Sequence, residues 1–76
     1  MMKADRYLDA KGLACPMPIV QTKKAMKDMQ TGEVLEVHTT DQGARSDLAA
    51  WAKSSGNELL HGSEEQGVLK FWLKKG

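Results

Sequence analysis

Cys15 is the residue of this sequence with the clearest capacity for chemistry, because a thiolate is a strong nucleophile. It is the only cysteine among the 76 residues, and Pro16, Met17 and Pro18 follow it directly. With no second cysteine at Cys-x-x-Cys spacing, a dithiol–disulfide cycle within one chain is excluded. A single thiol instead suits a carrier, which accepts an atom from one protein and offers it to another.

The prolines at positions 16 and 18 fix the place where a helix begins. Proline has a φ of about −65° and no N–H, so it suits the first turn of a helix. The residue before a proline is pushed out of the helical region, so Cys15 is expected at or next to the N-cap. A helix N-terminus carries partial positive charge and unpaired N–H groups, here those of Met17 and Ile19. This setting stabilises a thiolate, and it would hold a persulfide anion in the same way.

The plain alternative is a buried cysteine that packs as a small hydrophobic residue. The flanking prolines and the loop position favour a reactive thiol, because a core cysteine needs neither. No metal site is predicted, because the spacing of Cys15, His38 and His61 is not typical of structural zinc sites. Both histidines are expected to be ordinary strand residues, and no cofactor is expected. A Cys-His hydrolase fits poorly too, because so small a chain leaves little room for an oxyanion hole and a substrate cleft.

Turn signals divide the chain into six elements around this motif. Apolar residues recur on one face of two segments, which predicts amphipathic helices. They alternate with polar residues elsewhere, which predicts strands with one buried face. The predicted elements are a strand over Arg6–Ala10, a helix over Pro16–Gln30, a strand over Glu33–Thr40, a helix from about Gly43 to Ser55, and strands over Asn57–Ser63 and Val68–Lys74.

This βαβαββ order predicts an α/β (α+β) two-layer sandwich. Two amphipathic helices on one face of a four-stranded mixed sheet satisfy the pattern most simply. Gly32 is expected to end the first helix, since glycine tolerates the left-handed conformation. The polar loop at residues 64–67 is expected to close a hairpin. The other face of the sheet should meet solvent, with Glu36 and Lys70 among its residues. The residues expected on the buried helix faces are Ile19, Thr22, Met26, Met29, Ala44, Leu48, Trp51, Ala52 and Ser55.

Length and composition predict one small cytoplasmic domain over residues 1–76. Hydrophobic residues make up 41% and charged residues 28%, ordinary values for a globular protein. Neither a membrane-spanning run nor a secretory signal is recognisable. Eleven basic and ten acidic side chains give a net charge of +1, which argues against a large nucleic-acid footprint. The lysines form two groups nonetheless: Lys23, Lys24 and Lys27 lie in one predicted helix, and Lys70, Lys74 and Lys75 lie in the last residues. The two groups are either solvated faces or docking surfaces for an acidic partner.

The segment Leu8-Asp9-Ala10-Lys11-Gly12-Leu13-Ala14-Cys15-Pro16-Met17-Pro18 resembles the signature of the TusA/SirA family of sulfur carriers, with its Cys-Pro-x-Pro motif. The resemblance continues through Thr40-Asp41, Asp47-Leu48 and the closing hairpin, so it covers nearly the whole chain. It implies a βαβαββ sandwich similar to the C-terminal domain of translation initiation factor three. It also implies persulfide relay through the motif cysteine, here Cys15.

The resemblance implies two protein partners rather than a stand-alone turnover enzyme. The sulfur donor would be a cysteine desulfurase or a rhodanese, and a downstream acceptor would serve tRNA thiolation or another sulfur-trafficking pathway. A monomer suits sequential docking, and direct nucleic-acid binding is not expected. Around the motif, Gly12 is expected to turn the chain and Asp9 to hydrogen-bond the loop, unless Asp9 is a plain strand-end residue. Asp41 is expected to cap the second helix through its carboxylate.

Two rival functions remain open at this point. A nucleic-acid-binding or regulatory module is suggested by the initiation-factor-like fold, although no interleaved basic and aromatic stripe supports it. A one-cysteine redox protein of glutaredoxin type would reduce disulfides with glutathione, but its fold has a different element order.

Overall fold

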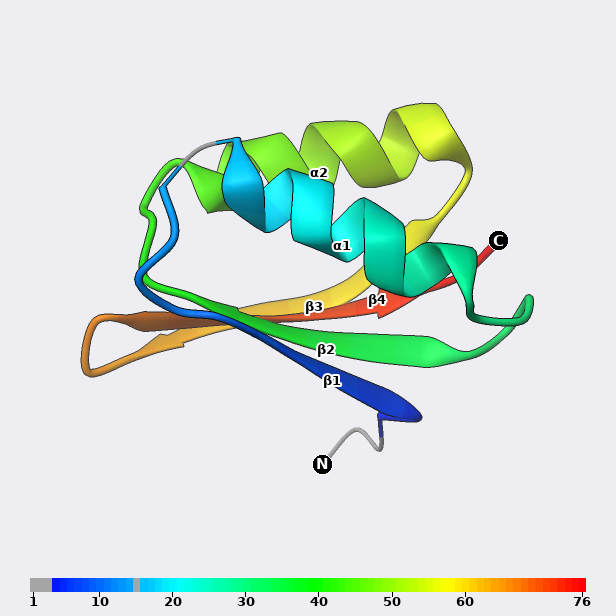
Figure 1. Cartoon of the computed structure of the whole chain (residues 1–76), viewed down its shortest axis with the longest axis horizontal. Helices are drawn as coiled ribbons and strands as arrows, with labels where there is room; N and C mark the ends of the chain where they lie inside the picture. Colours follow the sequence, from blue (N-terminus) through cyan, green and yellow to red (C-terminus); the bar gives the residue numbers. More distant parts are fainter. Residues whose placement is uncertain (1–3, 15) are drawn as a thin grey trace.

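The helices and strands form two layers (Figure 1), and the side chains between these layers make one hydrophobic core. The structure is a computed structural model and describes residues 4–14 and 16–76. Both helices lie on the same face of the sheet (Figure 1), as the alternating strands and one-sided helices predict. The elements are β1 (Arg6–Ala10), α1 (Met17–Lys27), β2 (Val34–Thr39), α2 (Ala44–Ser55), β3 (Glu58–Glu65) and β4 (Val68–Lys74).

The sheet is mixed, and its strand order is β1-β2-β4-β3. β1 pairs with β2 in parallel, with Leu8 opposite Val37, and the other two pairings are antiparallel. A parallel pair needs a crossover connection, which α1 provides. The predicted two-layer sandwich with a four-stranded mixed sheet is therefore confirmed.

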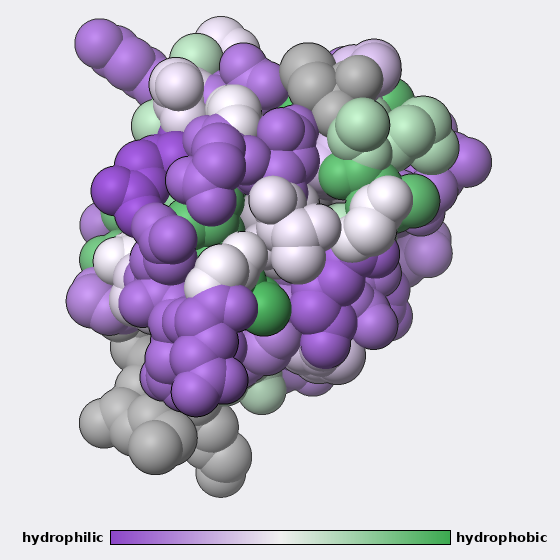
Figure 2. All heavy atoms as spheres, turned by 90° about the vertical axis from the view of Figure 1, so that its left-hand side faces the viewer, coloured by the Kyte–Doolittle hydropathy of each residue, from purple (hydrophilic) through white to green (hydrophobic). Residues whose placement is uncertain are grey.

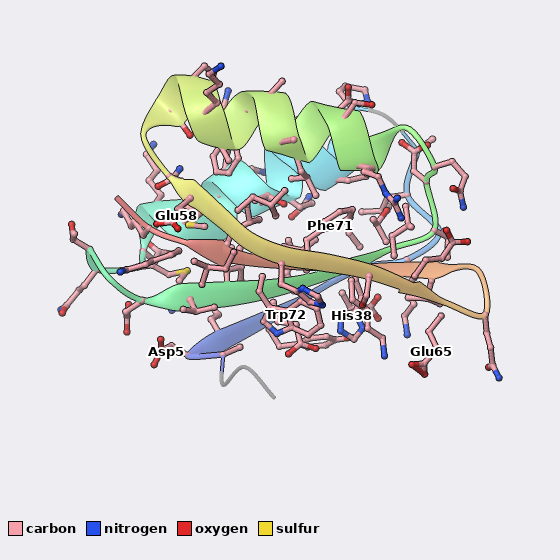
Figure 3. The ribbon with its side chains drawn as sticks, turned by 180° about the vertical axis from the view of Figure 1, so that it is seen from behind. Asp5, His38, Glu58, Glu65, Phe71 and Trp72 are labelled. Carbon is pink, nitrogen blue, oxygen red and sulfur yellow. The ribbon has the colours of Figure 1, made fainter. Side chains whose placement is uncertain are left out.

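The core is made by the inward residues of the sheet and the facing residues of both helices. Phe71 on β4 is its largest buried side chain and points toward the helices (Figure 3). Gly62 on β3 leaves room for that ring, because a Cβ there would lie 3.1 Å from the Phe71 side chain. The buried hydrophobic residues are Ala10, Met26, Met29, Leu35, Val37, Ala44, Leu48, Ala52, Leu69, Phe71 and Leu73. No helix in the described part of the chain is long and apolar enough to span a membrane.

The opposite face of the sheet carries polar and aromatic side chains. Tyr7, Glu36, Trp72 and His61 stand in register across all four strands. His38 and Trp72 project on the side away from the helices (Figure 3). His38 lies between the Tyr7 hydroxyl, 3.4 Å from its Nδ1, and the Glu36 carboxylate, 2.5 Å from its Nε2. Both histidines are strand residues, as expected.

Two element boundaries differ from the sequence prediction by more than one residue. α1 ends at Lys27 rather than near Gln30, because the chain closes in a tight final turn. In this turn the N–H groups of the next two residues, Asp28 and Met29, donate hydrogen bonds to the carbonyls three positions earlier, those of Ala25 and Met26. Gly32, with φ of 94°, belongs to the turn before β2 and does not end the helix. The hairpin turn is also tighter than the predicted four-residue loop. Gln66 and Gly67 alone have positive φ there, so β3 extends to Glu65.

The side chain of Lys75, which follows β4, caps the C-terminal end of α1. Its Nζ donates hydrogen bonds to the carbonyl oxygens of Met26 at 2.6 Å and Met29 at 2.5 Å. The last carbonyls of a helix lack partners within it, so a cation there both binds them and favours the helix dipole.

Replacing Lys75 with alanine should therefore lower the free energy of unfolding by about 2 kcal/mol, the range for hydrogen bonds to a charged group. Urea denaturation measures this loss. The neighbouring Lys74 is exposed, so Lys74→Ala should change the same quantity by less than about 0.5 kcal/mol. Equal losses in the two variants would contradict the assigned role of Lys75.

Candidate functional site

Two loops lie together at the edge of the sheet where β1 and β2 end. The strands are parallel, so the loop from β1 to α1 and the loop from β2 to α2 leave the same edge. Such edges, at the carboxyl ends of parallel strands, are common ligand-binding places in sheets with parallel strands. We call residues 11–16 the motif loop. Cys15 lies outside the described residues, so the site is built from its neighbours.

The motif loop is fixed at its start by three hydrogen bonds. Asp9 Oδ1 accepts one from the Lys11 N–H at 3.0 Å, and the Ala10 carbonyl accepts one from the Leu13 N–H at 3.3 Å. Gly12 has a φ of 83°, which residues with a side chain rarely adopt. Its N–H donates to Thr40 Oγ1 at 3.0 Å, which joins the motif loop to the loop after β2.

The other end of the motif loop leads directly into α1. Pro16 is the N-cap, with φ −96° and ψ 13°, and no described side chain caps the first turn. The Met17 N–H donates to the Ala14 carbonyl at 2.9 Å, so the expectation that this amide is free for a sulfur anion is wrong. Pro18 is fully buried, and its carbonyl accepts the Thr22 hydroxyl at 2.7 Å. The two prolines therefore differ: Pro16 is exposed at the loop, while Pro18 anchors the helix to the core.

Asp41 organises the second loop. Its Oδ1 accepts a hydrogen bond from the Gly43 N–H at 3.2 Å, and its carbonyl accepts one from the Ala44 N–H at 3.1 Å. Gly43 is the N-cap of α2, and no side-chain hydrogen bond caps the first turn. The Asp41 carboxylate thus forms a turn that leads into α2, whereas the sequence suggested a direct cap. Its Oδ2 is buried and has no hydrogen-bond partner among residues 4–14 and 16–76.

An open pocket of about 250 Å³ lies between the two loops. Its described lining residues are Gly12, Leu13, Ala14, Thr40 and Asp41. The pocket adjoins Cys15 along the chain, because Ala14 is bonded to that residue. Figure 2 shows this end of the molecule, where apolar side chains gather toward one edge and hydrophilic residues cover most of the remainder.

The structure brings most of the predicted site residues to this edge. Asp9, Gly12, Pro16 and Asp41 all belong to the two loops or border them, while Pro18 lies beneath in the core. Thr40 was not singled out as a site residue by sequence reasoning. Its only signal was its place beside Asp41 in a segment that resembles the family.

A family model, curated relatives and a solved structure all place this chain in the same family. The family model described as sulfurtransferase TusA matches residues 6–75. The sulfur carrier protein TusA of Allochromatium vinosum is 47% identical over 75 residues, which cover 99% of each chain. The crystal structure of a SirA-like protein from Desulfitobacterium hafniense superposes with a TM-score of 0.77 at 28% identity, covering 93% of this chain and 97% of that one.

Two relatives from Bacillus subtilis (strain 168) differ in length. YrkI is 61% identical over 75 residues, which cover 99% of this chain and 100% of YrkI. YrkF is 62% identical over 76 residues, which cover 100% of this chain but only 41% of YrkF. The same unit therefore occurs both by itself and within a longer chain.

Replacing Thr40 with valine should loosen the motif loop without unfolding the protein. Loss of one hydrogen bond costs about 1 kcal/mol, so the Gly12 amide should exchange its hydrogen about fivefold faster. Hydrogen exchange followed by NMR measures this. Thr31→Val, at an exposed threonine whose hydroxyl donates a long hydrogen bond of 3.4 Å to the Gly76 carbonyl, should leave the Gly12 exchange rate unchanged. An unchanged Gly12 rate in Thr40→Val would show that the two loops are not coupled through this bond.

Proposed function

This chain belongs to the TusA sulfurtransferase family and is a sulfur carrier, and we propose that it holds its sulfur as a persulfide on Cys15. One observation carries the proposal: the only cysteine of the chain stands in a short loop between a buried strand end and a helix start. Ala10 and Pro18, on either side of this loop, are fully buried, while Ala14 and Pro16, the neighbours of Cys15, are exposed. A rigid base with an exposed reactive segment suits a carrier that must reach into other proteins.

The proposed loading step needs no oxidant or reductant. The Cys15 thiolate attacks the terminal sulfur of a persulfide on the donor protein, and a new sulfur–sulfur bond forms. The sulfur–sulfur bond of the donor breaks, and its cysteine leaves as a thiolate that takes up a proton. In the unloading step a nucleophile of the acceptor attacks the terminal sulfur of Cys15 in the same way, and Cys15 leaves as a thiolate.

The described residues support this exchange by holding the loop rather than by adding a second reactive group. The hydrogen bonds of Asp9 and Thr40 fix the start of the motif loop, and Pro16 fixes its end. The start of α1 supplies the positive end of a helix dipole, which favours an anionic sulfur nearby. A fixed loop limits the entropy that is lost when a partner docks.

The donor, the acceptor and the cellular setting extend the proposal. A cysteine desulfurase or a rhodanese would load Cys15, and the acceptor would belong to tRNA thiolation or another sulfur-trafficking pathway. The carrier would act as a monomer in the cytoplasm, where reducing conditions keep a lone thiol free. It would be a component of a sulfurtransferase relay, without turnover of its own.

Intact-mass analysis tests this function. Incubation with a cysteine desulfurase and cysteine, or with a rhodanese and thiosulfate, should add one sulfur atom that a reductant removes. Cys15→Ser should fold normally and gain no sulfur from either donor. If the wild-type chain gained no sulfur from either donor, the carrier mechanism would fail, and retention on heparin would then test the nucleic-acid-binding alternative.

Variants of the two motif prolines should distinguish effects on stability from effects on the rate of sulfur loading. Pro16→Ala should lower the free energy of unfolding by less than about 1 kcal/mol, because alanine at this exposed N-cap position loses mainly the restriction that proline places on the unfolded chain. Pro18→Ala should cost more, about 1–2 kcal/mol, because part of a buried ring is also lost. Both should slow sulfur loading, which single-turnover mass analysis records beside urea denaturation. If Pro16→Ala unfolded the protein, or if it loaded at the wild-type rate, the assigned role of Pro16 would be wrong.

A further inference from the structure

The exposed face of α1 changes character along its length. The end next to Cys15 carries the exposed Pro16 and Met17 and the half-buried Val20, and three exposed lysines follow at helical spacing. Met17 is 39% exposed, which makes it one of two large hydrophobic residues exposed in the described part of the chain. We call this face the α1 strip. Its residues are Pro16, Met17, Val20, Lys23, Lys24 and Lys27.

No acidic side chain in the described part of the chain pairs with a lysine of the α1 strip. Among residues 4–14 and 16–76, the ion pairs use Arg45, Lys70 and His38, and none uses a lysine of α1. Arg6 and Lys75 bind backbone carbonyls instead. α1 itself contains no acidic residue, so the strip keeps three positive charges.

The place of the strip ties it to sulfur exchange. Pro16 follows Cys15 directly, so a protein that reaches Cys15 comes close to the exposed Pro16 and Met17. At 1.5 Å per residue, the helix carries the strip about 15 Å further, from Met17 to Lys27. A partner positioned on the cysteine therefore meets the apolar end first and the basic end beyond it.

We propose that the α1 strip is the docking surface for the protein that donates sulfur to Cys15. This donor protein presents an apolar recess flanked by carboxylates. The inference rests on the proposed function and adds the chemistry of the partner. Met17 fills the recess beside the reacting sulfurs. Lys23, Lys24 and Lys27 attract the carboxylates and speed the encounter, as charge complementarity does at protein interfaces.

A protein fits this surface better than a nucleic acid does. Three lysines neutralise about three phosphates, which gives only weak, salt-sensitive binding to nucleic acid. The apolar half of the strip offers nothing to a phosphate backbone. It is suited to a protein interface, where methionine and other apolar anchors are enriched.

The test compares loading rates from the donor protein that loads the wild-type chain, the desulfurase or the rhodanese. Lys23→Glu/Lys27→Glu should slow loading about tenfold at low salt, in the range of electrostatic steering, and the difference should shrink in 0.5 M salt, where the screening length is only a few ångströms. Lys53→Glu/Lys74→Glu makes the same change of net charge away from the strip and should stay near the wild-type rate. Lys27 and Lys53 both stand in the last turn of a helix, so their costs to stability are matched.

Met17→Ser should slow loading severalfold at every salt concentration, because an apolar contact is not screened. Tyr7→Ser removes the other exposed large hydrophobic residue, on the far face of the sheet, and should load normally. Inorganic polysulfide loads Cys15 without a docking protein, so all four variants should accept sulfur from it at closely similar rates.

Two results would overturn the proposal. Equal slowing by the two charge-reversed pairs would show a general effect of net charge. Wild-type loading in Lys23→Glu/Lys27→Glu, with loss of tRNA binding in the same variant, would assign the strip to nucleic acid. Failure of the proposed function looks different, because the wild-type chain itself would then accept no sulfur from either donor protein.

Discussion

The parallel pairing of β1 with β2 is the constraint on which the site depends. Because both strands run the same way and each is followed by a helix, their two connecting loops emerge at one edge of the sheet. The hydrogen bond from the Gly12 N–H to Thr40 Oγ1 then joins these loops. An antiparallel pair would send the loops to opposite edges, and the motif loop would lose its support from the second.

The remainder of the fold holds this edge in place. Buried residues at both ends of the motif loop, Ala10 and Pro18, leave only seven residues to cross between them. The far end of α1 is fixed by Lys75, which belongs to the last residues of the chain. A small domain with a limited core can thus keep one short segment exposed without loosening the elements that carry it.

The sequence was sufficient for features that depend on local pattern. The alternation of Leu35 and Val37 with polar neighbours predicted β2, because the period of a strand is a local property. Contacts between residues far apart in the sequence could not be predicted from local pattern. Lys75 donates a hydrogen bond to Met29, 46 positions away, and Thr40 accepts one from Gly12, 28 positions away. The end of α1 and the coupling of the two loops therefore could not be predicted. The motif did predict where α1 begins, because prolines restrict the backbone wherever they occur.

The sulfur carrier combines a fixed scaffold with a motif loop whose residues on both sides of Cys15 are exposed. The proposed mechanism depends on the form in which the sulfur is held. The most direct test is cyanolysis of the loaded chain after the donor has been removed. Cyanide takes the terminal sulfur from a persulfide as thiocyanate and leaves the cysteine thiolate. The account predicts one thiocyanate per loaded chain and a return to the unmodified mass. Release of no thiocyanate, with the added mass retained, would contradict it.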